Sequence, residues 1–391
     1  VSLDIFRGLT VALMVFVDYA GGVLPAINHS PWNGATLADF VFPFFLFVVG
    51  VSLAFSYKNV GSKMVATQKA VLRVLKLFIL GVFLQGGFIH GIHSLTYGVD
   101  VEKIRWMGIL QRIAIAYLVG ALCEIWLRDN NNASKKLSVL KKYRFQWAVV
   151  LVIVAIYLSS LYGLYVPDWE YQIPADGSLS QTRTFLVKCG VRGDTGPGCN
   201  AVGMIDRMVL GVNHLYQRPV YARNEVCSIN SPDNGPLPAD APSWCQAPFD
   251  PEGILSSAMA IVTCLVGLHF GHIIIEFKDH RDRVLHWFVP SALLVISGLA
   301  LDLFGMHINK ALYTISYMCV TSGAAGFLLS GIYLLVDECG YRRGALVFEW
   351  MGKHALTIYV LAACNLFPVV LHGFYWKQPQ NNILSLIGIG R

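Results

Sequence analysis

The sequence predicts an all-α integral membrane protein, a bundle of about nine or ten transmembrane helices with a disulfide-stapled loop region on the luminal side. Three observations support this fold class. Hydrophobic residues make up 55% of the 391 residues, and the mean hydropathy is +0.54. Only 14% of the residues are charged, against roughly 25% in soluble domains. Apolar runs of about 20 residues, long enough to cross a bilayer, recur along the chain.

Nine apolar runs have the length of a transmembrane helix. They cover residues 9–28, 36–57, 70–90, 106–127, 146–166, 253–275, 284–305, 311–337 and 344–372, and the tail 381–391 looks like the start of a tenth. Glycines and prolines inside these runs are compatible with spans, because neighbouring helices can satisfy the backbone groups that a break releases.

The basic residues fall mainly in every second connection between the predicted spans. Lys58, Lys63 and Lys69 follow the second run, and Arg128 with five further basic residues follows the fourth. Because cytosolic loops carry the excess of Lys and Arg, the pattern places the N-terminus in the cytosol and residues 29–35 on the luminal side. We therefore expect membrane lipids to surround the predicted spans. The net charge of +6 is spread too widely to predict a nucleic-acid partner.

The long connection 167–252 also falls on the luminal side. It contains Cys189, Cys199, Cys227 and Cys245. Four cysteines in one non-cytosolic connection predict two disulfides. Of the three pairings we expect the first with the second and the third with the fourth, because each closes a short Gly- or Pro-rich loop. The segment is predicted to be a mostly irregular cap, inserted between spans five and six of a single domain that covers 1–391.

Ionisable residues inside spans are costly and are usually functional or paired. His29 directly follows span one, and Asp39 lies about one turn into span two on the same side of the membrane. A carboxylate bonded to one imidazole nitrogen orients the ring and makes the other nitrogen a better base. Asp18 is a second candidate partner, provided that the helix unwinds near Gly21 or Pro25. A histidine at the membrane surface without a role remains the alternative.

Two basic residues inside spans need partners. Arg112 lies about six residues into span four, where it could bind an anion such as a phosphate or pair with Asp18 or Asp39. Lys353 is placed to pair with Glu349 one helical turn away, and this is favoured over binding an anionic ligand from the cytosol. His90 and His93 have no further ligands at the spacing of a metal site, so no metal is predicted.

Several motifs, in chain order, resemble the heparan-α-glucosaminide N-acetyltransferase family of multi-span membrane enzymes. They are SLDIFRGLTVALMVFVDYAGG, HSPWNGATLADFVFPFFLFVVG, GILQRIAIAYLV, IDRMVLGVNHLYQRPVY, FDPEGILSS, INKALYTISY and GKHALTIYV. Each alone is weak, but together they are specific and run along nearly the whole chain. The stretch WCQAPFDPEG resembles the plant members most closely.

The resemblance implies a transmembrane acetyltransferase. The acetyl group of cytosolic acetyl-CoA would move to a glucosamine-like amino sugar, or to another glycan acceptor in a plant chain, on the luminal side of a lysosomal, vacuolar or other endomembrane. The essential histidine of the family lies in a motif that reads H-S-P-W-N-G here, and it carries over to His29. A polar residue of span one is Asn in the animal enzyme and Asp18 here, a departure from the family pattern.

The predicted site follows from these two lines of reasoning. His29 is the general base or the acetyl carrier, and Asp39 or Asp18 orients it. Asn33 or Trp32 could donate to the oxyanion. The residues predicted to hold acetyl-CoA are Gln111, Arg112, Lys353 and Trp32. A homodimer is left open. A multi-span transporter of a small anionic or sugar substrate also fits buried charges and broken helices, although no repeat divides the chain into two halves.

Overall fold

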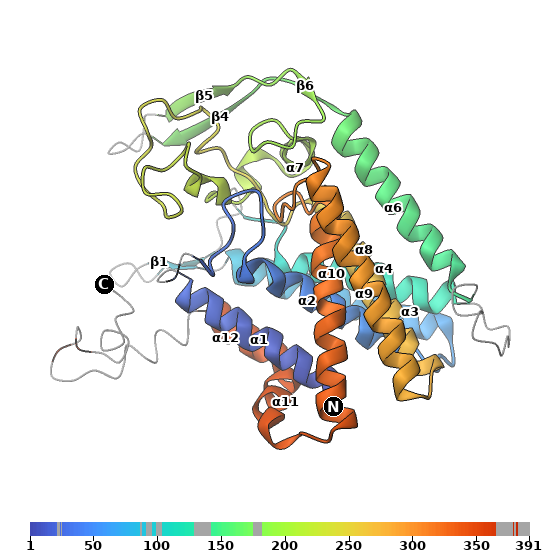
Figure 1. The fold of residues 1–391 in the computed structure, drawn as a ribbon. Coiled ribbons are helices and arrows are strands. Elements are labelled where there is room, and N and C mark those ends of the chain that lie inside the picture. Colours follow the sequence, from blue (N-terminus) through green and yellow to red (C-terminus); the bar gives the residue numbers. More distant parts are fainter. Residues whose placement is uncertain are drawn as a thin grey trace.

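The computed structural model describes residues 1–21, 24, 26–86, 88–90, 96–98, 104–128, 142–174, 182–364, 378 and 381. Helices form the body of the molecule, and a smaller strand-containing region lies at one end of them (Figure 1). Among the described residues, six helices are long and apolar enough to cross a membrane: α2 (Leu37–Ser56), α4 (Ile109–Trp126), α6 (Arg144–Gly163), α8 (Ile254–Glu276), α9 (His280–Leu303) and α10 (Ile315–Tyr333) with its π-helical extension η3 (Leu334–Glu338). The predicted all-α membrane architecture is confirmed.

Three of the nine predicted spans differ in the structure. Helix α1 (Ser2–Ala20) begins seven residues before the predicted start at 9 and ends well before 28. Its polar first turns are helical because Arg7 donates to the Ser52 hydroxyl of α2 and to Asp4, contacts that an average of hydropathy cannot detect. Helix α3 (Lys63–Gly86) likewise begins before residue 70.

The predicted ninth span, 344–372, is two short helices in its described part. They are α11 (Leu346–Lys353) and α12 (Ala355–Ala363), separated at His354, and the 3₁₀ turn η4 (Arg343–Ala345) precedes them. Helix α11 lies against α1 so closely that a side chain on Gly352 would collide with the Asp4 carbonyl. Residues 365–372 and the predicted tenth span lie outside the described residues.

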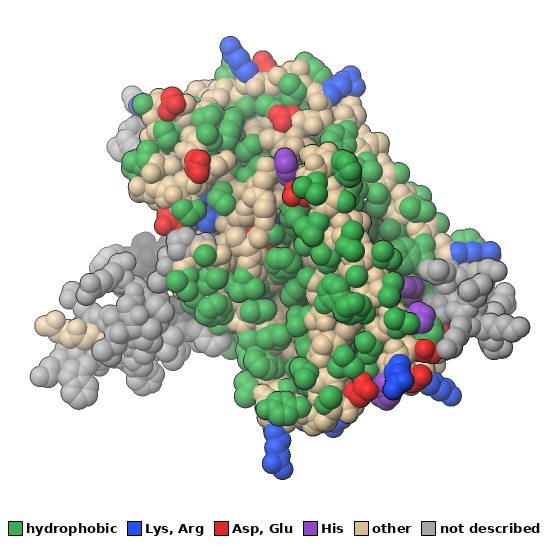
Figure 2. Space-filling view, viewed as in Figure 1, with side chains coloured by type: hydrophobic (Ala, Val, Ile, Leu, Met, Phe, Trp, Pro, Cys, Tyr) green, Lys and Arg blue, Asp and Glu red, His purple; other side chains and the backbone are tan. Residues whose placement is uncertain are grey.

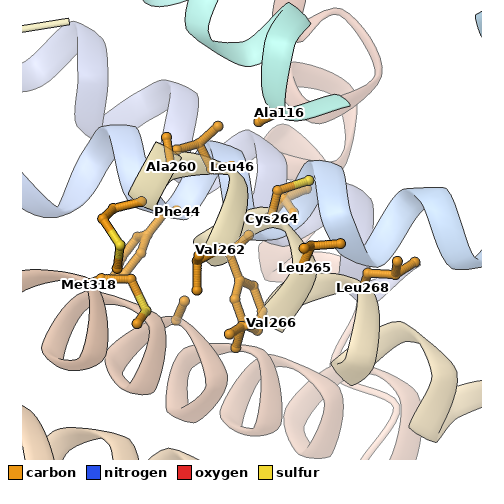
Figure 3. Close-up of a cluster of buried hydrophobic side chains, with 14 of the residues drawn as sticks. Phe44, Leu46, Ala116, Ala260, Val262, Cys264, Leu265, Val266, Leu268 and Met318 are labelled. Carbon is orange, nitrogen blue, oxygen red and sulfur yellow. The ribbon is translucent and has the colours of Figure 1, made fainter. Parts of the chain in front are cut away.

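The centre of the bundle is the packing of α2, α8 and α10. Figure 3 shows Phe44 and Leu46 of α2, Val262 and Val266 of α8 and Met318 of α10 filling the space between these helices. The α2 and α8 backbones approach so closely that a side chain on Gly267 would collide with the backbone of α2. Because lipid tails are as apolar as these side chains, close packing stabilises this centre more than the hydrophobic effect does.

The outer helices bury much less of their surface. Only 22% of the most apolar 18-residue stretch of α6 is buried inside the protein, and only 17% of that of α9. The corresponding share is 72% in α2 and in α8. Figure 2 shows hydrophobic side chains over the middle of the molecule, with most charged side chains at its two ends. This distribution is that of helices whose outer faces contact lipid.

The cap, residues 167–252, contains short strands and helical segments. Strands β4 (Trp169–Pro174) and β5 (Thr182–Val187) pair antiparallel, and the short strands β3 (Tyr165–Val166) and β6 (Val191–Arg192) form a second pair. Helix α7 (Ala201–Leu210) and the 3₁₀ turns η1 (Val212–His214) and η2 (Val220–Arg223) follow. The remaining described residues of the cap are turns and irregular segments, so the cap is mostly irregular, as predicted. Outside the cap, β1 (Phe88–His90) pairs with β2 (Thr96–Gly98).

Both predicted disulfides are confirmed. Cys189 is bonded to Cys199, and Cys227 to Cys245. The cap also lies over the loop between α1 and α2, because the Trp32 indole donates to the Thr195 carbonyl at 3.0 Å. Figure 1 shows this loop rising from the helices toward the cap. The 29–35 loop and the cysteine-bearing segment therefore lie at the same end of the bundle.

Candidate active site

A histidine–aspartate pair lies where the α1–α2 loop meets α2. The Nδ1 atom of His29 is 2.8 Å from Oδ1 of Asp39, whose side chain is fully buried. In the tautomer with the proton on Nδ1, this nitrogen donates to the carboxylate, which can only accept a hydrogen bond. The lone pair of the neutral ring is then on Nε2. This is the arrangement in which an imidazole acts as a base or a nucleophile.

Asp39 is held in place by the start of its own helix. Thr36 is the N-cap of α2, and Oδ2 of Asp39 accepts from the Thr36 amide at 3.0 Å and the Thr36 hydroxyl at 3.1 Å. It also accepts from the Ser30 amide at 3.1 Å. This capping box fixes the carboxylate before any substrate binds. One oxygen caps the helix while the other orients His29.

Lys310 completes the cluster, and sequence reasoning did not single it out. Its Nζ lies 2.9 Å from Nδ1 and 3.4 Å from Nε2 of His29, and 3.5 Å from Oδ1 of Asp39. Burial and then the charge of Lys310 lower the pKa of His29 below its ordinary value, and they outweigh the opposite effect of Asp39. The ring is therefore kept in its neutral form. The only sequence signal was the position of Lys310 in the INKALYTISY motif.

The backbone around His29 is held from three directions. Arg223 of the cap donates to the His29 carbonyl at 2.6 Å. The Asn309 amide donates to the Asn33 side-chain oxygen at 3.2 Å, and the backbones of these two residues form a β-bridge. The Tyr317 hydroxyl donates to the Asp39 carbonyl at 2.5 Å. Elements distant in sequence thus position one imidazole.

Two cavities reach His29, and a third shares a lining residue with one of them. The His29 cavity, about 210 Å³, lies beside His29, Arg105, Glu252 and Lys310. The Arg218 cavity, about 850 Å³, is formed mostly by the cap and also reaches His29. The Arg73 cavity, about 330 Å³, lies between α1, α2, α3, α4 and the α11–α12 pair. Among the described residues, His29 is shared by the first two cavities and Ile109 by the first and third.

The Arg73 cavity carries positive charge among mostly apolar walls. Arg7, Arg73 and Lys353 line it, together with residues such as Val48, Leu77 and Leu356. The guanidinium of Arg73 lies 5.1 Å from the centre of the Tyr117 ring. Lys353 pairs with Glu349 at 2.6 Å, as predicted, and it also lines the cavity. Such a cavity suits a long ligand with an apolar body and an anionic head.

Comparison with known proteins finds one family of relatives. Residues 1–162, which include His29 and Asp39, match a family model described as the catalytic region of heparan-alpha-glucosaminide N-acetyltransferase. The heparan-alpha-glucosaminide N-acetyltransferase of Mus musculus is 30% identical over 401 residues, which cover 96% of this chain and 54% of the relative. The Homo sapiens protein of the same name is 29% identical over 406 residues, covering 97% and 54%. The chain is thus similar to these N-acetyltransferases over nearly its whole length. It spans about half the length of these two relatives.

In the structure, Asp18 and the two oxyanion candidates do not have the predicted contacts. Asp18 is exposed near the end of α1, and Asp39 is the carboxylate that contacts His29. The Trp32 indole N–H is used by the cap, so it does not serve an oxyanion or a cofactor in this arrangement. Asn33 is exposed and bonded to Asn309. Lys310 is the cation that contacts the His29 ring.

Arg112 and Gln111 are both fully buried in α4. Arg112 donates to the Ser256 and Ser257 hydroxyls and, at 2.8 Å, to the Pro251 carbonyl, so it fastens α4 to the start of α8. Its described partners include neither Asp18 nor Asp39, and it lines none of the three cavities. Gln111 packs against Gly81 of α3. The structure gives both residues protein partners where we predicted a cofactor.

A second ionic cluster was missed by sequence reasoning. Arg105 donates to Asp250 at 2.8 Å and 2.5 Å and to Glu252 at 2.5 Å. Both carboxylates lie in the FDPEG motif, which the sequence analysis used only as part of the family resemblance. Among the described residues no group of three or more metal-ligating side chains occurs. The side chain of His90 and the whole of His93 lie outside that part of the chain.

Proposed function

We propose that the protein transfers the acetyl group of acetyl-CoA to the amino group of a glucosamine-like sugar across a membrane. His29 is the residue that handles the reacting groups, and acetyl-CoA is a substrate that enters by the Arg73 cavity. The observation that carries this proposal is the position of the His29–Asp39 pair between two cavities. The His29 cavity shares Ile109 with the cationic Arg73 cavity, and the Arg218 cavity is formed mostly by the cap.

The Arg73 cavity is matched to the chemistry of CoA. Its three cations can pair with phosphates, and its apolar walls can hold the pantetheine arm. The thioester would then point along α4 toward His29. This assignment replaces Arg112 and Gln111 with Arg7 and Arg73 and retains Lys353.

The neutral His29 ring supplies the proton transfer. Nε2 removes a proton from the ammonium of the acceptor, and the free amine attacks the thioester carbonyl. The C–S bond then breaks, the new C–N bond remains, and the imidazolium gives its proton to the CoA thiolate. The neutral ring formed in this way takes the second proton from the new amide nitrogen and releases it to water. The Lys310 ammonium is placed to stabilise the oxyanion. In a two-step alternative, Nε2 itself attacks the carbonyl, CoA leaves, and the acceptor amine removes the acetyl group from the ring.

The Arg218 cavity is proposed to bind the acceptor. Its lining includes the amides of Gln172, Gln217 and Gln246 and the cations Arg218 and Arg223. Side-chain amides are suited to sugar hydroxyls, because each amide offers both donors and acceptors. We place this cavity on the luminal side of a lysosomal, vacuolar or other endomembrane, with the N-terminus in the cytosol. The cap inserted in a single domain, 1–391, and a homodimer both remain predictions.

The proposal is tested with protein reconstituted in sealed vesicles. Labelled acetyl-CoA is supplied on the side of the basic connections, and a panel of amino sugars is enclosed on the cap side. Appearance of labelled N-acetyl sugar inside supports the proposal. No transfer to any amino sugar would refute it, and passage of an amino sugar without acetyl-CoA would favour the transporter alternative. A burst of CoA released without acceptor distinguishes the acetyl-enzyme route from direct transfer.

A further inference from the structure

Ile109 occupies a narrow place between two cavities. It is the one residue, among those described, that lines both the Arg73 cavity and the His29 cavity. It is also the first residue of α4, directly after the Gly108 N-cap. The side chain of Ile109 is therefore part of the wall of both cavities.

The surrounding structure holds Ile109 in a fixed position. Arg105, four residues earlier, is anchored to Asp250 and Glu252, and Arg112, three residues later, is anchored to the Pro251 carbonyl at 2.8 Å. Both anchors lie in the short segment 250–252. The start of α4 is thus fastened on both sides of Ile109, so this part of the wall of the His29 cavity is held in place.

We propose that Ile109 determines the length of the acyl group that the enzyme transfers. This inference rests on the proposed function. The acyl carbon of a thioester must reach His29, and the chain beyond it must fit in the His29 cavity of about 210 Å³, whose wall includes Ile109. Apolar pockets discriminate against one extra methylene by about 10–200-fold. The branched side chain of Ile109 admits acetyl and hinders longer chains, while Arg105 and Arg112 act by positioning it.

Ile113 provides a matched control. It is the same residue type, one turn further along α4, and it lines the Arg73 cavity but not the His29 cavity. Trimming Ile113 should change the KM for every acyl-CoA by a similar factor. Trimming Ile109 should change the relative rates of acyl-CoAs of different length.

The experiment compares kcat/KM for acetyl-, propionyl- and butyryl-CoA in the wild type, Ile109→Ala, Ile109→Val and Ile113→Ala. We expect Ile109→Ala to raise the butyryl-to-acetyl ratio at least about 10-fold, Ile109→Val to raise it less, and Ile113→Ala to leave it unchanged. An unchanged ratio in both Ile109 variants, or an equal rise in Ile113→Ala, would overturn the inference. If Ile109→Ala does not fold, the ratio in Ile109→Val decides.

A larger side chain gives the opposite test. Ile109→Trp should lose acyl transfer, because the larger side chain takes up space in the His29 cavity, while equilibrium dialysis should still show CoA bound by Arg7, Arg73 and Lys353. Normal acetyl transfer by Ile109→Trp would contradict the inference. If the wild type transfers no acyl group from any acyl-CoA, the proposed function fails, whereas wild-type acetyl transfer with unchanged ratios refutes only the role of Ile109.

Discussion

Replacing Asp39 by Asn separates the two tasks of this side chain. An amide oxygen in the place of Oδ2 still accepts from Ser30 and Thr36, at the present 3.0–3.1 Å, so the cap of α2 survives. The amide nitrogen then replaces Oδ1 and faces His29 and Lys310. A donor cannot accept the Nδ1 proton, so the ring must adopt the other tautomer, with the proton on Nε2. His29 thereby loses the lone pair with which it acts.

The expected effect on catalysis is large, and the effect on folding is small. Loss of a positioned base lowers the rate by about 10²–10⁴-fold. Removing the charged partner of Lys310 costs about 1–3 kcal/mol of stability. Asp39→Ala should be as inactive and about 1 kcal/mol less stable than Asp39→Asn, because it also loses the cap. Acetyl transfer and thermal unfolding of detergent-purified protein measure both. Activity of Asp39→Asn within about threefold of the wild type would refute this reasoning.

Three further substitutions test other parts of the account. Lys310→Met removes a positive charge beside His29, so the pKa of His29 should rise. The acid limb of the pH–rate profile should then move to higher pH. An unmoved limb would contradict the contact between Lys310 and the His29 ring. Arg73→Gln should raise the KM for acetyl-CoA about tenfold with little change in kcat, as loss of one charge-assisted contact implies, and an unchanged KM would remove Arg73 from the CoA site. Gly267→Ala should lower the melting temperature, because its new methyl group meets the α2 backbone. Gly331→Ala should leave the melting temperature unchanged, because the space around Gly331 is open. Equal melting temperatures of the two variants would refute the close packing of α8 against α2.

The membrane architecture was predictable from the sequence because length and apolar content determine which segments can cross a bilayer. The disulfide pairing was predictable for a similar reason, since short loops limit which cysteines can meet. The boundaries of α1 were not predictable in this way. Arg7 enters the bundle because Ser52, on another helix, receives one of its hydrogen bonds. Such a contact exists only in three dimensions.

The candidate site was predicted in part. His29 and Asp39 are close in sequence, and a short loop brings them together. Lys310 contacts the same ring from a part of the chain about 280 residues away, and no periodicity or spacing indicates that approach. Arg112 was misjudged because a buried arginine can be satisfied by hydroxyls and a carbonyl as well as by an anion.

The rate of acetyl transfer by His29→Ala is the measurement that tests the central claim most directly. His307→Ala is its control, because His307 also faces an aspartate, Asp302 at 3.3 Å, but is 55% exposed and lines none of the three cavities. The account predicts that His29→Ala loses at least about 10²-fold in transfer while its CoA binding is kept, and that His307→Ala resembles the wild type. Wild-type transfer by folded His29→Ala would contradict it.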